Sequence, residues 1–119
     1  MNVLGRVLLL GALAAGCGAS EEEVQAEFNA FVADHDDCQA ATDCALMSPG
    51  CPLGCSTALR ADAVDEAEAL AEDLVDDYER SGTHCDYECV GAQRVACTDG
   101  ACQVCPDPDA GTDCVDGLR

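Results

Sequence analysis

The sequence predicts a small α+β, disulfide-rich domain in which two helices pack on a small antiparallel sheet. The chain has 119 residues and 11 cysteines, but only two Phe, two Tyr and no Trp. Cross-links must therefore replace much of the usual packing of bulky side chains. Two segments carry apolar residues at helical spacing. The cysteine-dense remainder has short apolar runs between Gly, Pro and Asp turn residues, which is typical of short strands.

An export signal is predicted for residues 1–16. Arg6 precedes the apolar run Val7–Ala15, which is shorter than the about 20 residues that a membrane-spanning helix needs. Small residues, Ala15 and Gly16, stand where a signal peptidase would cut. Cleavage by an ordinary signal peptidase in the same stretch remains an alternative to lipoprotein processing.

The run Leu13–Cys17 resembles the lipobox of bacterial lipoproteins, in which the cysteine thiol accepts a diacylglycerol. It departs from that motif at Ala14, where Leu is usual. The resemblance implies that Cys17 is lipidated, that residues 17–20 form a short tether, and that acyl chains such as palmitate hold the protein to a membrane of the bacterial cell envelope. Gly18 replaces the Asp that retains many lipoproteins at the inner membrane, so the outer membrane is the expected location.

The charge balance of the chain is strongly acidic. Five arginines and no lysine oppose 24 acidic residues, and the formal net charge is −19. Such a field repels phosphate backbones, which excludes a nucleic-acid partner. The acidity either serves solubility or attracts cations or a basic partner, and composition leaves both readings open.

The first helix is predicted over Glu21–Ala33. Ser20 and Glu23 have the spacing of a capping box, in which a hydroxyl and a carboxylate bond to the first backbone amides. An apolar stripe at helical spacing follows it: Val24, Phe28, Phe31 and Val32.

The next segment, residues 38–59, is rich in cysteine and interrupted by Pro and Gly. Strands are expected at Ala45–Met47 and Cys55–Leu59. Two turns, Ser48–Gly50 and Pro52–Gly54, separate them.

The second helix has the clearest pattern in the chain. Asp62 is expected as its N-cap, and Ser81–Gly82 as its end. Its apolar stripe comprises Ala63, Val64, Ala67, Leu70, Ala71, Leu74, Val75 and Tyr78.

Repulsion weakens this second helix in isolation. Like charges four residues apart each cost about 0.2–0.5 kcal/mol, and only Asp76 with Arg80 offsets them. The helix must therefore be stabilised by packing against other elements. The repelling pairs are Glu68/Glu72, Glu72/Asp76 and Asp73/Asp77.

Strand patterns return after the second helix. A hairpin turn is expected at Thr98–Gly100, because Gly favours the positive φ of such turns. The domain is predicted to span residues 21–105, and residues 106–119 to form a flexible acidic tail with Cys114 as its only tether. The expected strands are Cys85–Cys89, Val95–Cys97 and Ala101–Val104.

Ten cysteines remain after Cys17, and export into an oxidising space predicts that all of them pair as five disulfides. Each disulfide typically contributes about 2–4 kcal/mol. Cys97 and Cys102 flank a tight turn and could bridge it, whereas Cys114 is expected to close a short loop with Cys105. The remaining connectivity stays open. The ten candidates are Cys38, Cys44, Cys51, Cys55, Cys85, Cys89, Cys97, Cys102, Cys105 and Cys114.

Several of these cysteines follow a recognisable order: Cys38-x5-Cys44, Cys51-Pro-Leu-Gly-Cys55, an acidic helix, Cys85-x3-Cys89 and Cys97-x4-Cys102. This order resembles small cysteine-rich lipoproteins of myxobacteria and their relatives, which are mostly uncharacterised. The resemblance covers residues 38–105 and implies an extracytoplasmic domain without a known activity. Paired Cys-x3-Cys motifs also resemble disulfide-linked helical hairpins, but Pro52 and Gly54 are poor helix residues.

Metal chemistry has weak support in the sequence. His35 and His84 each lie near a cysteine, as in zinc sites, but exported thiols are usually oxidised before they meet a metal. Asp107, Asp109 and Asp113 resemble a calcium loop, yet the loop lacks the Glu that such sites need at their twelfth position. No metal or cofactor is therefore expected.

The predicted function is a membrane-anchored, non-enzymatic structural or protein-binding module with an unknown protein partner. An alternative is a protease-inhibitor-like binder whose exposed, disulfide-braced loop, Ser48–Leu53, enters an active site. A third possibility is a thiol–disulfide redox protein that uses Cys102 and Cys105. That Cys-x2-Cys motif lacks the strand–helix context of thioredoxin-like enzymes, and Pro106 follows it.

Overall fold

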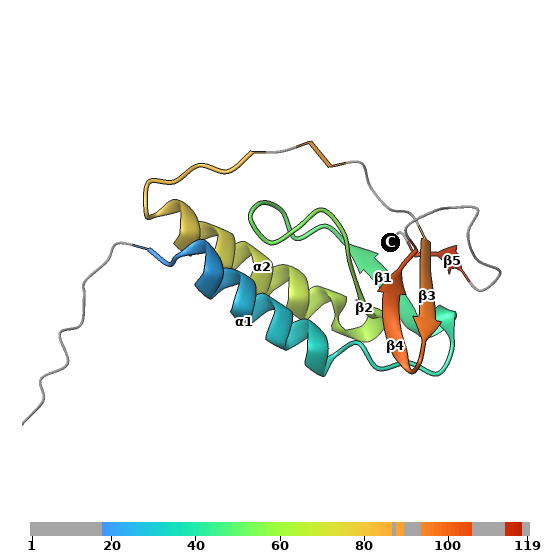
Figure 1. Ribbon diagram of the computed structural model, residues 1–119. Coiled ribbons are helices and arrows are strands. Elements are labelled where there is room, and N and C mark those ends of the chain that lie inside the picture. Colours follow the sequence, from blue (N-terminus) through green and yellow to red (C-terminus); the bar gives the residue numbers. More distant parts are fainter. Residues whose placement is uncertain (1–17, 87, 90–93, 106–113, 118–119) are drawn as a thin grey trace, which may run out of the picture.

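A computed structural model describes residues 18–86, 88–89, 94–105 and 114–117 (Figure 1). The predicted signal, residues 1–16, and the lipidation candidate Cys17 lie outside this part of the chain. Single turns of 3-10 helix, Ala41–Asp43 and Ala61–Ala63, precede β1 and α2. The other elements are α1 (Glu21–Asp34), β1 (Cys44–Met47), β2 (Thr57–Arg60), α2 (Val64–Glu79), β3 (Arg94–Thr98), β4 (Ala101–Val104) and β5 (Val115–Asp116).

The predicted α+β class is confirmed, but the strands form two sheets instead of one. Strands β1 and β2 pair in a two-stranded antiparallel sheet, and the second sheet has the antiparallel order β4-β3-β5. The two-stranded sheet lies between the helices and the second sheet (Figure 1). All four residues of β1 are buried, because alternate side chains along a strand face opposite layers.

One apolar core lies between the helices and the two-stranded sheet. The two helices run antiparallel (Figure 1), and their apolar stripes meet one face of β1 and β2. Leu70 and Val75 of the predicted stripe are only half-buried, at its margin. The buried members of this core are Val24, Phe28, Ala45, Met47, Leu59, Ala63, Val64, Ala67, Ala71, Leu74 and Tyr78.

A second core joins the two sheets. Leu46 and Ala58 point away from the helices and meet Val95 of β3, which is fully buried. Cys44 and Cys102 complete this cluster, so sulfur atoms supply part of the apolar packing. The two sheets are thus held by both burial and covalent links.

The two helices begin in different ways. Ser20 caps α1 as predicted, and its hydroxyl accepts a hydrogen bond from the Glu23 amide at 3.2 Å. The prediction that Asp62 caps α2 is wrong. The Asp62 carboxylate accepts from Arg60 Nε at 3.0 Å, and α2 starts through the 3-10 turn, with Ala63 at the N-cap position and no side-chain cap. The Asp62 carboxylate therefore binds the guanidinium of Arg60 and not the first amides of the helix.

The end of α2 lies where the sequence predicts it. Gly82 has φ 81° and its amide donates to the Glu79 carbonyl, which ends the helix. The expected pairing of Arg80 with Asp76 is wrong, because Arg80 Nη1 lies 2.8 Å from Asp77 Oδ1 instead. Both spacings are accessible on a helix surface, so sequence position alone does not choose between them.

The β3–β4 hairpin confirms the predicted turn. Asp99 and Gly100 both have positive φ, 52° and 80°, as a two-residue turn of the favoured hairpin type requires. Strand β4 has the predicted bounds, and β3 extends the predicted Val95–Cys97 by one residue at each end.

The strand predicted at Cys85–Cys89 is wrong for the described residues there, which are irregular. A strand needs a hydrogen-bonded neighbour, and the neighbour here is the loop between β1 and β2. The backbone groups of Gly50 and Gly54 in that loop form hydrogen bonds with each other. Disulfides rather than a backbone ladder therefore hold this segment.

The C-terminal residues join the domain at more points than Cys114, which corrects the expectation of a single tether. Strand β5 pairs with β3, and the Gly117 carbonyl accepts from the Leu46 amide at 2.9 Å. Residues 106–113 of the predicted tail lie outside the described residues. Within the part that is described, neither helix is long and apolar enough to cross a membrane.

Candidate functional site: an acidic groove beside α2

All ten cysteines from Cys38 onward are paired, which confirms the prediction of five disulfides. The expected Cys105–Cys114 bridge is present. The suggested Cys97–Cys102 bridge is wrong, because each cysteine instead crosses to the segment around β1. The five disulfides are Cys38–Cys97, Cys44–Cys102, Cys51–Cys85, Cys55–Cys89 and Cys105–Cys114.

This pairing also corrects the redox candidate. Cys102 is bonded to Cys44 and Cys105 to Cys114, so the Cys-x2-Cys motif does not form a disulfide of its own. Cys102 and Cys105 are both buried. The motif therefore lacks the exposed thiol that exchange at an active site requires.

Two disulfides position the irregular segment beside the helices. Cys51–Cys85 and Cys55–Cys89 join the β1–β2 loop, residues 48–56, to the segment that follows α2, with Cα atoms 5.7 Å and 5.3 Å apart. The four-residue spacing matches on the two sides. The two bridges therefore fix the described part of this segment, residues 83–86 and 88–89, over the loop (Figure 1).

The β1–β2 loop lies against the helices instead of projecting into solvent. Pro49 and Pro52 are buried, and Gln25 Nε2 of α1 donates to the Pro52 carbonyl at 2.9 Å. Leu53 packs against the helix-facing core. The expectation of an exposed loop at Ser48–Leu53 is therefore wrong, and the inhibitor alternative loses the feature on which it depends.

A groove of about 550 Å³ lies between α2, the β1–β2 loop and the segment after α2. Its floor is apolar, and its rim carries carboxylates along the exposed edge of α2 and from Asp86. We call it the acidic groove. The floor comprises Met47, Pro49, Ala71, Val75 and the Cys51–Cys85 disulfide, and the rim comprises Glu68, Glu72, Asp76, Glu79 and Asp86.

The rim charges lack compensation within the described residues. No basic residue is among those described around the groove, and no ion pair found in the described part of the chain uses a rim carboxylate. Arg60 and Arg80 are engaged by other carboxylates. Repulsion along Glu68, Glu72 and Asp76 thus remains as free energy that a bound cation would relieve.

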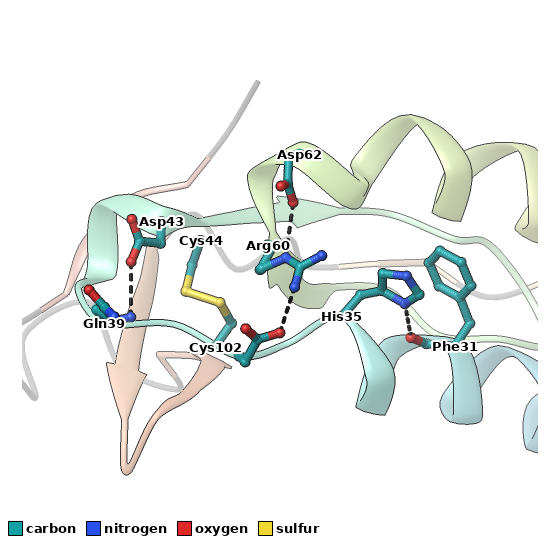
Figure 2. A network of polar contacts seen from close by, with 9 residues as sticks. Phe31, His35, Gln39, Asp43, Cys44, Arg60, Asp62 and Cys102 are labelled. Carbon is teal, nitrogen blue, oxygen red and sulfur yellow. Dashed lines mark hydrogen bonds and ion pairs between the residues drawn. A yellow bond between two sulfur atoms is a disulfide. The ribbon is translucent and has the colours of Figure 1, made fainter.

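A second polar cluster lies near the start of α2 and is satisfied internally (Figure 2). Arg60 bonds Asp62 through Nε at 3.0 Å and Asp37 through Nη1 at 2.7 Å. The hydrogen bond that Arg60 donates to Asp62, together with the negative charge of Asp37, raises the pKa of Arg60. One guanidinium therefore joins β2 to the segment after α1, and this cluster has a structural role.

The histidines do not form zinc sites with their neighbouring cysteines. His35 Nδ1 lies 2.7 Å from the Phe31 carbonyl, and the two rings stack at 4.0 Å between centroids (Figure 2). His84 is exposed. The nearby Cys38 and Cys85 both have their sulfur atoms in disulfides, which overturns that zinc geometry. The calcium candidates Asp107, Asp109 and Asp113 lie outside the described residues.

The rim carboxylates can be recognised in the sequence, but the groove cannot. The acidic spacing of α2 is visible in the sequence as repulsion, whereas the floor exists only once the β1–β2 loop folds back on α2. No protein-family model, curated protein or solved structure matches this chain.

Proposed function

We propose that this protein is a lipid-anchored, non-enzymatic module of the bacterial cell envelope that binds a basic protein segment in its acidic groove. The five disulfides fit an oxidising, extracytoplasmic compartment. The resemblance of Leu13–Cys17 to a lipobox supports the anchor. The observation that carries the binding role is an apolar floor beneath an uncompensated acidic rim.

A basic side chain matches both parts of this groove. The stems of Arg and Lys are apolar and the charge is at the tip. Such a stem would cover Met47 and Val75 while the cation meets Glu72 or Asp76. Arginine fits best, because its guanidinium bonds a carboxylate with two parallel hydrogen bonds. The long-range acidic field would also accelerate the approach of such a partner.

The negative charge of the chain indicates that the partner is a different protein, and neither a segment of this chain nor a second copy of it. Outside the described residues the chain supplies only Arg6 and Arg119 as basic residues, and Arg6 belongs to the predicted signal. A second copy would bring a further formal charge of −19. Neither source offers the basic, partly apolar segment that the groove fits.

Charge reversal tests this proposal. The probe is a synthetic peptide in which arginine alternates with leucine, and binding is measured by calorimetry. Glu72→Lys should lower the affinity for the peptide about tenfold, or by about 1.4 kcal/mol, because it puts a positive charge on the rim that repels the arginines of the peptide. Glu27→Lys is the matched control, since Glu27 is exposed on α1 and does not line the groove. Its Kd should change far less.

Two results would overturn the groove proposal. One is an equal loss of affinity in Glu72→Lys and Glu27→Lys, which would mean that only total charge matters. The other is the absence of peptide binding by the unaltered protein at low salt, where electrostatic attraction is least screened.

A further inference from the structure

Four cysteines converge where the two sheets face each other. The Cys38–Cys97 and Cys44–Cys102 disulfides lie side by side, and the Sγ atoms of Cys38, Cys44 and Cys102 are all within 4.8 Å of one another. Among the described cysteines, no other three come this close. Sulfur atoms at this separation need little movement to exchange partners.

The β3–β4 hairpin offers Cys97 a second partner. Cys97 and Cys102 are opposed across the hairpin. The Cys102 amide donates outward to the Asp36 carbonyl at 2.6 Å, so the pair is of the non-hydrogen-bonded kind. Cα atoms of such pairs are about 4.5 Å apart, within the range of about 4.4–6.8 Å that a disulfide spans.

We propose that these four cysteines form a thiol-reactive site with two alternative disulfide pairings. The interlayer pairing, seen in the structure, is Cys38–Cys97 with Cys44–Cys102. The local pairing is Cys38–Cys44 with Cys97–Cys102. The co-reactant is a small thiolate, which acts as a catalyst and is returned at the end. This proposal is independent of the acidic groove.

The exchange proceeds in three balanced steps. The external thiolate attacks Cys97 Sγ, forms a mixed disulfide there and releases the Cys38 thiolate. Cys38 then attacks Cys44 Sγ, which forms Cys38–Cys44 and releases the Cys102 thiolate. Cys102 finally attacks Cys97 Sγ across the hairpin, forms Cys97–Cys102 and expels the external thiolate. No net oxidation or reduction occurs, and the number of disulfides stays the same.

Exposure determines where the reaction begins. Cys38 and Cys97 are half-exposed, whereas Cys44 and Cys102 are 6% and 5% exposed. A thiolate from solvent therefore reaches the Cys38–Cys97 disulfide more readily than the Cys44–Cys102 disulfide. The consequence is structural, because the interlayer pairing joins the sheets covalently, whereas the local pairing leaves them joined only by packing and hydrogen bonds such as that from the Leu46 amide to the Gly117 carbonyl.

Disulfide mapping tests the proposal on the full, oxidised chain. The protein is incubated with a small amount of reduced glutathione at mildly alkaline pH, quenched with acid and alkylated. A protease that cuts before Asp separates Cys38 from Cys44 at Asp43 and Cys97 from Cys102 at Asp99. Further digestion with chymotrypsin at Leu46 and trypsin at Arg94 separates Cys44 and Cys97 from the cysteines of the other disulfides. Mass spectrometry should detect both local cross-links, in equal amounts, only when the thiol was present.

The two disulfides between the β1–β2 loop and the segment after α2, here called the cysteine ladder, provide an internal control. Cys51–Cys85 and Cys55–Cys89 should keep their pairing under the same conditions, because their sulfur atoms are absent from the close group found among the described residues. The proposal is overturned if the interlayer pairing persists at every thiol concentration that leaves this ladder intact. It is also overturned if Cys38, Cys44, Cys97 and Cys102 exchange partners no more readily than the cysteines of the other three disulfides.

A variant removes the need for external thiol. Cys97→Ser leaves Cys38 as a free thiol beside Cys44–Cys102, so Cys38–Cys44 cross-links should form unaided. Cys85→Ser is the matched control, and its free thiol should stay on Cys51. Retention of Cys44–Cys102 with the thiol wholly on Cys38 would contradict the proposal. If Cys97→Ser does not fold, the mapping of the unaltered chain still decides.

Discussion

Asp43 illustrates how single carboxylates shape the chain before β1. Its Oδ2 accepts hydrogen bonds from the amides of Gln39 at 2.9 Å and Ala40 at 3.0 Å (Figure 2 shows the first). These backbone hydrogen bonds lower the pKa of Asp43 below its ordinary value of 3.8. The ionised carboxylate thus fixes the turn that carries Cys44 into the sheet.

Asp43 gives a prediction about pH. Because its pKa is lowered by folding, its contribution is complete above the ordinary value of 3.8 and disappears as pH falls through the lower, folded value. Asp43→Asn should therefore have a lower melting temperature than the unaltered protein near neutral pH. The two proteins should converge in acid. Thermal unfolding between neutral pH and strong acid measures this, and a gap that stays constant would contradict it.

Cys17 is the residue on which the proposed membrane anchor depends. Cys17→Ser should abolish membrane anchoring, because serine cannot form the thioether to the lipid. Fractionation of cells fed labelled palmitate measures both attachment and lipid. If the unaltered protein carries no label and the variant remains equally membrane-bound, the protein is not a lipoprotein.

At the scale of single elements, α2 has two tasks on adjoining faces, which meet at Ala71. Ala67, Ala71 and Leu74 are buried against the two-stranded sheet, while Glu72 and Asp76 form the groove rim. The buried face stabilises the helix despite the repulsion on the exposed face. Substitutions on the two faces should therefore separate folding from binding.

Leu74→Asp and Glu72→Lys test this separation. Leu74 is 5% exposed, so an aspartate there should cost about 3–5 kcal/mol of unfolding free energy. Leu70→Asp should cost less, because Leu70 is half-buried. Glu72→Lys should stay within about 0.5 kcal/mol, since it removes two repulsions on a solvated face. Denaturant titrations compare them, and equal stability of Leu74→Asp and the unaltered protein would mean that the buried face is misassigned.

The elements with local causes were predictable from the sequence. Helix α1 follows from the Ser20 cap and the spacing of Val24 and Phe28, and the β3–β4 hairpin follows from Asp99–Gly100. These features depend on residues within a few positions of one another. The prediction for α1 was accurate to one residue at its C-terminal end.

The features that depend on distant residues were not predictable. Strand β5 has two residues, which is too short to show any alternation. The Cys85–Cys89 segment has the composition of a strand but no free backbone neighbour. Cys102 forms a disulfide with Cys44, 58 positions away, and not with Cys97 on the facing strand. Local spacing cannot reveal such choices, and the acidic groove depends on one of them, the Cys51–Cys85 bridge.

At the scale of the whole molecule, the proposed anchor at Cys17 and the order of the layers together predict an orientation at the membrane. A Cβ at Gly18 would lie 2.5 Å from the Asp77 carbonyl oxygen and the Ser81 nitrogen, and the Ala19 amide donates to that carbonyl at 3.2 Å. The chain is therefore packed on the end of α2 one residue after Cys17 (Figure 1). A lipid on Cys17 would place the helix ends at the membrane and the three-stranded sheet away from it.

The central claim is that the acidic groove is the binding surface of this module. Amide chemical shifts of the labelled protein, recorded during titration with the arginine–leucine peptide, test it most directly. The account predicts that the largest shifts map to Gly50, Val75, Asp76 and Cys85 around the groove, and that a peptide with glutamate in place of arginine causes none. Shifts spread evenly over the acidic surface, or centred on Glu21–Glu23 of α1, would contradict it.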